Sequence, residues 1–249
     1  MAPVSQPVDP SSDRLDDIAV QVWGVVEYQA ALARQLELHA RRVAGQIGDV
    51  LVLVAHPPTF TLGRHAPEAD IVLNRAELER RGIVVARSDR GGRATYHGPG
   101  QVVLYPIVSI ADLGLGVKDW VCLLEGAVLA TLAGFGVTGH RRASTAGIWT
   151  APEGGSKIAS LGLRISRGTS YHGIAINTGL DASVFDCIVT CGVRGERVTT
   201  IAAETGRAVD DDAVASMLVR HVAASIRQVR ERRPGIAPAT RRTPTNERS

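Results

Sequence analysis

The stretch DRGGRATYHGPGQVVLYPI, residues 89–107, carries the fold-deciding signal of this chain. It continues from one run rich in β-branched residues, IVVARS (83–88), into another, VVLYPIV (102–108), and such runs predict strands. Between them stand several glycines, a proline, two arginines and a histidine. Glycine permits positive φ and a close approach of another molecule. The connection is therefore either a structural hairpin or a ligand-binding loop, and its composition favours neither.

The rest of the chain predicts one domain that mixes strands and helices. Further strands are expected at 19–26, 49–58, 157–166 and 170–177, the last two as a hairpin around Arg167-Gly168. Helices are expected over 27–46, over 118–133, and from the acidic residues 210–212 to about Arg230. Because strands and helices do not alternate regularly, the predicted fold class is α+β, with a mixed, largely antiparallel sheet flanked by helices.

The composition is that of an ordinary globular protein, with 249 residues, of which 45% are hydrophobic and 21% charged. No apolar run approaches the ~20 residues that span a bilayer, and the N-terminus lacks the features of a secretory signal. Three cysteines are too few for a disulfide framework, so we expect a cytoplasmic protein. We expect a single domain at 17–230 between disordered tails at 1–16 and 231–249.

The net charge of +3 comes from the C-terminal tail. Residues 231–249 hold five arginines and two glutamates, which account for all of it and leave the body formally neutral. The body has no basic stripe interleaved with aromatic residues, so no nucleic-acid partner is expected. The glycine patterns that bind dinucleotides or nucleotide phosphates are also missing. We further expect no membrane partner and a monomeric state.

A second group of segments supplies reactive side chains: GGSKIASLG (154–162), TSYHGIAIN (169–177) and VTCGV (189–193). A lysine, a histidine and a cysteine would meet here if these segments converge at one end of the sheet. A thiol reacts as its thiolate, which a nearby cation or base favours. A cysteine followed by glycine, as at Cys191, is therefore a candidate nucleophile, and Lys157 and His172 are the neighbours that could activate it.

Each of these side chains also has a structural interpretation. Lys157 could be a solvated lysine at a strand edge, and His172 a hydrogen-bonded histidine of the core. Cys122 lies on an apolar helix face, where cysteine acts as a small buried hydrophobe. Cys187 and Cys191 could be half of a zinc site, but the chain lacks a second ligand pair at suitable spacing, so no metal is expected.

Three segments in this order, RGGRATYHGPGQVVLYPI, GGSKIASLGLRISRGTSYHGIAIN and CGVRGERVTTI, closely resemble the lipoyl(octanoyl) transferases. HPPTFTLGRHA (56–66) fits the same family, and the resemblance covers about residues 17–230. It implies the biotin/lipoate protein ligase-like catalytic domain, a mixed sheet around a ligand tunnel. It also implies transfer of an octanoyl group from acyl carrier protein to a lysine of lipoyl domains. The implied acceptors are the E2 subunits of 2-oxoacid dehydrogenases and the glycine cleavage H protein.

The resemblance also implies roles for individual residues. Cys191 corresponds to the nucleophile, and Lys157 to the lysine that activates it. The implied substrate-binding residues are Arg90, Gly91, Gly92, Arg93, Ala94, Thr95, Tyr96, His97, Ser160, Leu161, Gly162, Gly173, Ile174 and Ala175. Glycines there would keep a slot open for the acyl chain, which any Cβ would narrow. No cofactor is implied, because the donor is the octanoyl-phosphopantetheine thioester of the carrier, which is already activated.

Local chemistry supports the same choice of cysteine, since an aspartate precedes Cys187 and its charge opposes thiolate formation. Three other functions stay open. An ATP-dependent lipoate or biotin protein ligase would share the fold without needing Cys191. A non-catalytic module that binds acyl groups or lipoyl domains would keep the tunnel. A cysteine hydrolase would release free octanoate.

Overall fold

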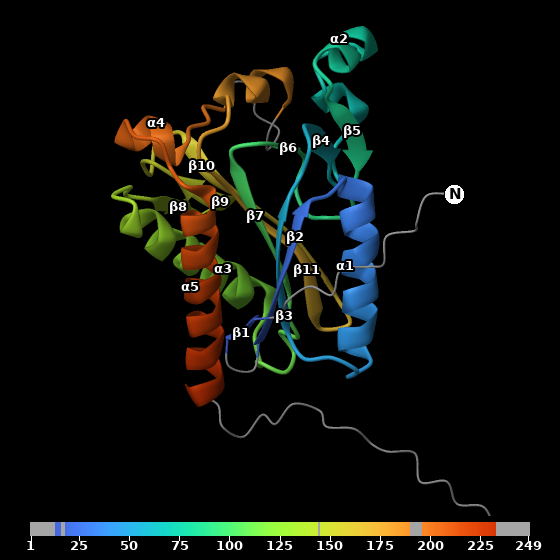
Figure 1. Cartoon of the computed structure of the whole chain (residues 1–249), viewed down its shortest axis with the longest axis vertical. Helices are drawn as coiled ribbons and strands as arrows, with labels where there is room; N and C mark the ends of the chain where they lie inside the picture. The colour runs from blue at the N-terminus through green and yellow to red at the C-terminus, as the bar shows by residue number, and fades with distance from the viewer. Residues whose placement is uncertain (1–12, 16–17, 144, 190–195, 233–249) are drawn as a thin grey trace, which may run out of the picture.

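The computed structural model describes residues 13–15, 18–143, 145–189 and 196–232. An eight-stranded sheet forms the body of the molecule (Figure 1). In spatial order its strands are β1 (Asp13–Leu15), β2 (Ile18–Val25), β3 (Val50–Ala55), β7 (Gln101–Ile107), β11 (Thr169–Asn177), β10 (Lys157–Ser166), β9 (Thr145–Trp149) and β8 (His140–Arg142). Strands β2 and β3 run parallel, and the other neighbouring pairs run antiparallel. The predicted fold class is confirmed.

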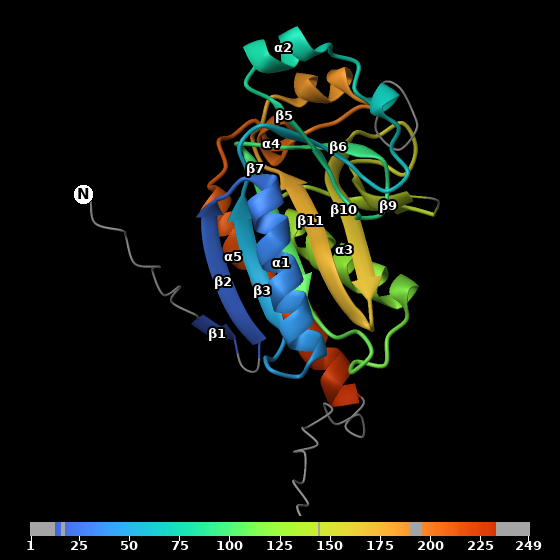
Figure 2. The same ribbon diagram turned by 90° about the vertical axis from the view of Figure 1, so that its right-hand side faces the viewer.

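Helices cover both faces of this sheet (Figures 1 and 2). Helix α1 (Tyr28–Val43) lies on one face, and α3 (Val117–Gly134) and α5 (Asp211–Arg232) pack together on the other. Strand β7 is buried along its whole length between these layers. Its alternate residues serve opposite faces, because successive side chains of a strand point to opposite sides. Val102 and Leu104 belong to the α3/α5 core, whereas Val103 and Tyr105 belong to the α1 core.

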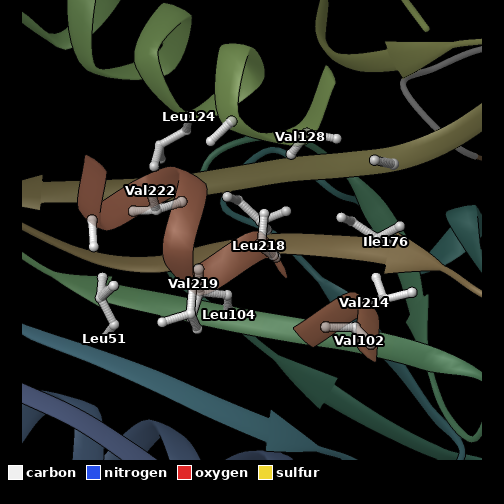
Figure 3. Packing of buried hydrophobic residues seen from close by; sticks show 14 of the residues in the cluster. Leu51, Val102, Leu104, Leu124, Val128, Ile176, Val214, Leu218, Val219 and Val222 are labelled. Atoms are coloured by element: carbon white, nitrogen blue, oxygen red, sulfur yellow. The ribbon is translucent and has the colours of Figure 1, made fainter. Parts of the chain in front are cut away.

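Helix α5 closes the larger core through apolar residues spaced three and four apart. Figure 3 shows Val214, Leu218 and Val222 pointing toward the sheet and toward α3. Acidic residues occupy the first turn of α5 and arginines the last, which complements the helix dipole. The predicted final helix is therefore confirmed, and it ends at Arg232 rather than at Arg230.

A second, three-stranded sheet lies across the upper end of the large one (Figure 2). Its order is β5 (Val84–Arg87), β4 (Thr59–Leu62) and β6 (Ala94–His97). The predicted strand at 83–88 exists, but it pairs with β4 and not with β7, so the hairpin interpretation of the opening stretch is wrong. Half of the glycine-rich stretch is itself strand β6, which pairs with β4 from Thr59↔His97 to Leu62↔Ala94.

The remaining elements are short, and two of them lie between β4 and β5, the other two between β11 and α5. They are η1 (Glu68–Asp70), α2 (Arg75–Arg80), η2 (Ala182–Cys187) and α4 (Ile201–Thr205). Asp13–Leu15, which the sequence assigns to the N-terminal tail, pair with β2. The rest of both predicted tails, apart from the end of α5, lies outside the described residues. Within the described ranges, no helix is long and apolar enough to cross a membrane.

Leu218→Ala should lower the free energy of unfolding by about 2–5 kcal/mol, because it empties space in the α3/α5 core where Leu218 is fully buried. Urea denaturation followed by circular dichroism measures this change. Leu36→Ala is the matched control, since Leu36 is 44% exposed on α1 and its loss should cost about 0.5 kcal/mol or less. Equal effects of the two substitutions would contradict the packing described for α5.

Candidate active site

A cavity of about 360 Å³ opens where β6, β7, β10 and β11 come together. Residues from distant parts of the sequence meet on its wall. The predicted site residues found there are Arg90, Gly91, Gly92, Arg93, Ala94, Thr95, His97, Lys157, Ser160, Leu161, Gly162, Gly173, Ile174 and Ala175. The wall also includes apolar residues that were not predicted: Val103, Val117, Val121, Leu163, Ile165, Phe185 and Val198. The cavity is thus an apolar slot with a few polar groups at defined positions.

Tyr96 is the predicted substrate-binding residue that the structure places elsewhere. Its neighbours Thr95 and His97 line the cavity, and alternation along β6 turns Tyr96 to the opposite side. There its ring packs against Phe60 and Phe185, with centroids 5.7 and 5.9 Å apart. Tyr96 therefore stabilises the core of the second sheet.

The glycines of this region are needed where backbone meets backbone. The Gly91 N–H donates to the Leu163 carbonyl of β10 at 2.9 Å. A Cβ on Gly63 would stand 2.5 Å from the Gly92 carbonyl oxygen, and one on Gly173 would stand 2.1 Å from the Leu104 carbonyl oxygen. The sequence predicted that glycine makes room for a ligand. At these positions the absence of a Cβ allows close contacts between segments of the protein itself.

Two arginines hold the glycine-rich stretch in place. The buried Arg90 guanidinium donates to the carbonyl oxygens of Thr61 (2.8 Å) and Gly91 (3.0 Å). Arg93 Nε donates to Asp70 at 2.8 Å, and the Asp70 carbonyl accepts from the Val189 N–H at 2.8 Å. Arg93 therefore connects the glycine-rich stretch to the chain two residues before Cys191.

Lys157 opens β10 and is only 6% exposed, so its interpretation as a solvated strand-edge lysine is wrong. The segment after residue 195 brackets its backbone: the Lys157 N–H donates to Arg197 O at 2.7 Å, and its carbonyl accepts from Thr199 N at 2.9 Å. Its Nζ lies 3.8 Å from Glu196 Oε2 and 5.0 Å from the centre of the Trp149 ring. The Lys157 amine is thus held between a carboxylate and an aromatic face.

His172 is a buried, hydrogen-bonded histidine that also borders the cavity. Its φ is +55°, a value rare for residues other than glycine. Extending the Ile174↔Leu104 register puts it opposite Pro106, which has no N–H to donate. The His172 N–H donates to Gln35 Oε1 at 2.8 Å, and its Nε2–H donates to Asp89 at 2.8 Å. Burial lowers the pKa of His172 to about 4, so the ring is neutral at neutral pH.

His97 presents an unprotonated nitrogen. Gln101 donates through Nε2 to Asn177 Oδ1 (2.9 Å), so its Oε1 accepts from His97 Nδ1–H (2.8 Å). In the neutral ring Nε2 is then left as an acceptor. Burial, with a smaller effect of His56, holds the pKa of His97 well below its usual value. His56 donates to Val26 O and accepts from the Tyr105 hydroxyl, both at 2.7 Å, and burial lowers its pKa too. The histidines on this side of the cavity are therefore neutral, and the Arg90 guanidinium supplies the positive charge near them.

The three cysteines differ in what the structure says of them. Cys191, the predicted nucleophile, lies outside the described residues, but Phe185 and Val198 on either side of that gap both line the cavity. Cys187 is buried, does not line the cavity, and has its sulfur 3.7 Å from Arg81 Nη1. Cys122 is exposed on α3, so its expected burial is wrong: the face of the helix that carries it points to solvent. The described residues contain no metal-binding cluster of histidine, cysteine and acidic side chains.

Comparisons with known proteins find similar sequences along most of the chain. The family model "Lipoyl protein ligase A/B catalytic domain" matches residues 27–223. The octanoyltransferase of Chloroflexus aggregans is 44% identical over 208 residues, covering 83% of this chain and 94% of that protein. The octanoyltransferase of Syntrophobacter fumaroxidans is 40% identical over 209 residues, covering 84% and 89%.

Solved structures share the fold at low sequence identity. A bi-partite lipoate protein ligase from Thermoplasma acidophilum, described with its E2 lipoyl domain, superposes with a TM-score of 0.63 at 17% identity, covering 83% of each chain. LipL1 of P. falciparum in complex with lipoate gives 0.66 at 15% identity, covering 85% of this chain and 63% of that one. These likenesses concern the fold.

Protonation of His172 should by itself lower the free energy of unfolding by about 3 kcal/mol as the pH drops from 6.5 to 4, since its pKa is about 4 when folded and ~6.5 when unfolded. His56 and His97, whose pKa values are also lowered, add to the total pH dependence. The unfolded chain binds the proton more readily, so this stability is complete above pH 6.5 and is lost toward pH 4. Urea denaturation at several pH values measures it. His172→Asn, which tolerates the positive φ, should flatten the dependence, whereas His65→Asn at an exposed site should not. An unchanged slope in His172→Asn would show that His172 is not responsible.

Proposed function

The chain belongs to the lipoyl protein ligase A/B catalytic domain family, and we propose that it is an octanoyltransferase. It moves an octanoyl group from the phosphopantetheine thioester of acyl carrier protein, through a thioester on Cys191, to a lysine of lipoyl domains. The acceptors are the E2 subunits of 2-oxoacid dehydrogenases and the glycine cleavage H protein. One observation carries the mechanism: the buried Lys157 amine, the apolar slot and both flanks of the segment that contains Cys191 meet at one place. The reaction takes place in the cytoplasm, where thiols stay reduced.

The first half of the reaction transfers the acyl group to the enzyme. The Cys191 thiolate attacks the carbonyl carbon of the donor thioester, and the carbon–sulfur bond to phosphopantetheine breaks. The pantetheine thiol leaves with the proton that Lys157 took from Cys191. Because a thioester is already an activated acyl group, no ATP, metal or other cofactor is required.

The second half delivers the acyl group to the acceptor. A lysine amine must be neutral to attack, yet it ordinarily titrates near pKa ~10.4. Lys157 accepts a proton from the acceptor amine as the amine attacks the Cys191 thioester. The new amide forms as the carbon–sulfur bond to Cys191 breaks, and Lys157 passes its proton to the departing sulfur, which restores the Cys191 thiol.

The cavity suits an eight-carbon chain. Leu161, Ile174 and Ala175 supply apolar wall, and the methylenes of an octanoyl chain would contribute about 0.8 kcal/mol each on burial, or roughly 5 kcal/mol in total. Arg90 and Arg93 fix the glycine-rich stretch rather than transfer protons, in keeping with their contacts to Thr61 and Asp70. The neutral imidazoles beside the slot let a chain pass without burying an unpaired charge.

Incubation with octanoyl-acyl carrier protein should add one octanoyl mass to the enzyme, and hydroxylamine should remove it, as it does a thioester. Intact-mass spectrometry measures both. Cys191→Ser should abolish transfer to a lipoyl domain, while Cys187→Ser, the matched control, should keep most of it because Cys187 does not line the cavity. An inactive Cys187 variant beside an active Cys191 variant would overturn the assignment.

Lys157→Ala should slow formation of the adduct by at least ~100-fold without unfolding the protein, since proton transfer by a placed side chain contributes about that much. Rapid quenching and mass spectrometry give the rate.

Alternative functions would leave other products. An acyl-adenylate formed from octanoate and ATP would indicate a ligase, and free octanoate a hydrolase. A wild-type enzyme that binds the acyl group with no adduct would indicate a binding module.

A further inference from the structure

Glu196 carries an unusual, incompletely satisfied carboxylate beside Lys157. Its Oε1 accepts a hydrogen bond from Trp149 Nε1 at 3.1 Å, which fixes the orientation of the group. Its Oε2 is buried, accepts no hydrogen bond among the described residues, and lies 3.8 Å from Lys157 Nζ. The two side chains are 11% and 8% exposed. Solvent therefore screens this pair weakly, and each charge is felt strongly by the other.

Other charged groups also lie near Glu196 and Lys157. From β8, Arg142 Nη1 lies 4.0 Å from Glu196 Oε1, and its guanidinium lies 4.6 Å over the Trp149 ring. From α3, Glu125 accepts from the Gly147 N–H at 3.1 Å and pairs with Arg141 at 3.1 Å.

Next to Glu196, the Arg197 side chain donates to the Gly154 carbonyl. Among these neighbours, Glu196 is the carboxylate that the structure places at ion-pair distance from Lys157.

We propose that Glu196 is a positioning residue, whose carboxylate orients the Lys157 side chain and stabilises the ammonium that forms when the Lys157 amine accepts a proton in the reaction. A carboxylate this close stabilises the ammonium over the neutral amine. It equally disfavours a thiolate near Lys157, so its charge acts on both members of the proposed pair. The role in catalysis rests on the proposed octanoyl transfer, whereas the coupling of Glu196 to Lys157 does not.

The chain offers a direct way to observe this coupling, because its only two lysines are Lys118 and Lys157. Labelling lysine with ¹³C at Cε therefore gives two NMR signals, and Lys118 is exposed on α3 and serves as the internal reference. Glu196→Gln removes the charge but keeps an oxygen that can accept from Trp149. The titration midpoint of the Lys157 signal should then fall by about one pH unit, while that of Lys118 stays unchanged. A Lys157 midpoint that stays or rises would overturn the proposal.

The pH dependence of the rate of octanoyl-adduct formation gives the second readout. In Glu196→Gln both limbs of the profile should move to lower pH by about one unit, because removing a negative charge lowers the proton affinity of every nearby group. Glu196→Asp, which keeps the charge, should move the profile less. Glu153→Gln makes the same charge change at an exposed site and should leave it in place.

A purely structural role would look different. Glu196→Gln would then reduce the rate by the same factor at every pH and leave the profile where it was, which would contradict the proposal. If the wild-type enzyme forms no adduct at all, the proposed function fails. The NMR titration still decides whether Glu196 controls the proton on Lys157.

Discussion

The burial of β7 on both faces is the constraint from which the site follows. Its alternate side chains fill two separate cores, so the strand cannot shift by one residue without exposing both sets. Pro106 within it leaves a gap in the ladder to β11, and the chain there adopts the positive φ of His172. Gly173 next to it lies against the β7 backbone. A rigid central strand thus fixes the floor of the cavity.

Charge is distributed unevenly around the cavity. One side carries neutral histidines and tyrosine hydroxyls that satisfy one another through hydrogen bonds, including the His56–Tyr105 pair. The other side gathers Lys157, Glu196 and Arg142 around the Trp149 ring. In the proposed octanoyl transfer, the apolar wall of the cavity would hold the alkyl chain and Lys157 would transfer protons. One small cavity would then combine tight packing of an alkyl group with acid–base chemistry.

Long periodic segments were predictable from the sequence, and short or context-dependent features were not. The β10–β11 hairpin formed as expected because Arg167-Gly168 accepts the two positive φ values of a tight turn. Strands β4 and β6 have four residues each. They are strands because they pair with each other, and no local sequence pattern predicts that pairing. The outward turn of Tyr96 depended on the register of β6. The exposure of Cys122 depends on which face of α3 packs against the sheet. The pairing of Glu196 with Lys157 depends on their distance in the folded chain, which the sequence does not reveal.

One backbone connection has a mechanical consequence. Lys157, the first residue of β10, makes two main-chain hydrogen bonds with the residues that follow position 195. Its N–H donates to the Arg197 carbonyl, and its carbonyl accepts from the Thr199 N–H. Any thermal displacement of that edge moves the Lys157 amine together with the chain that leads out of the cysteine-bearing segment. Lys157 and the chain from Arg197 to Thr199 should consequently move as one unit, and their separation should fluctuate less than the position of either.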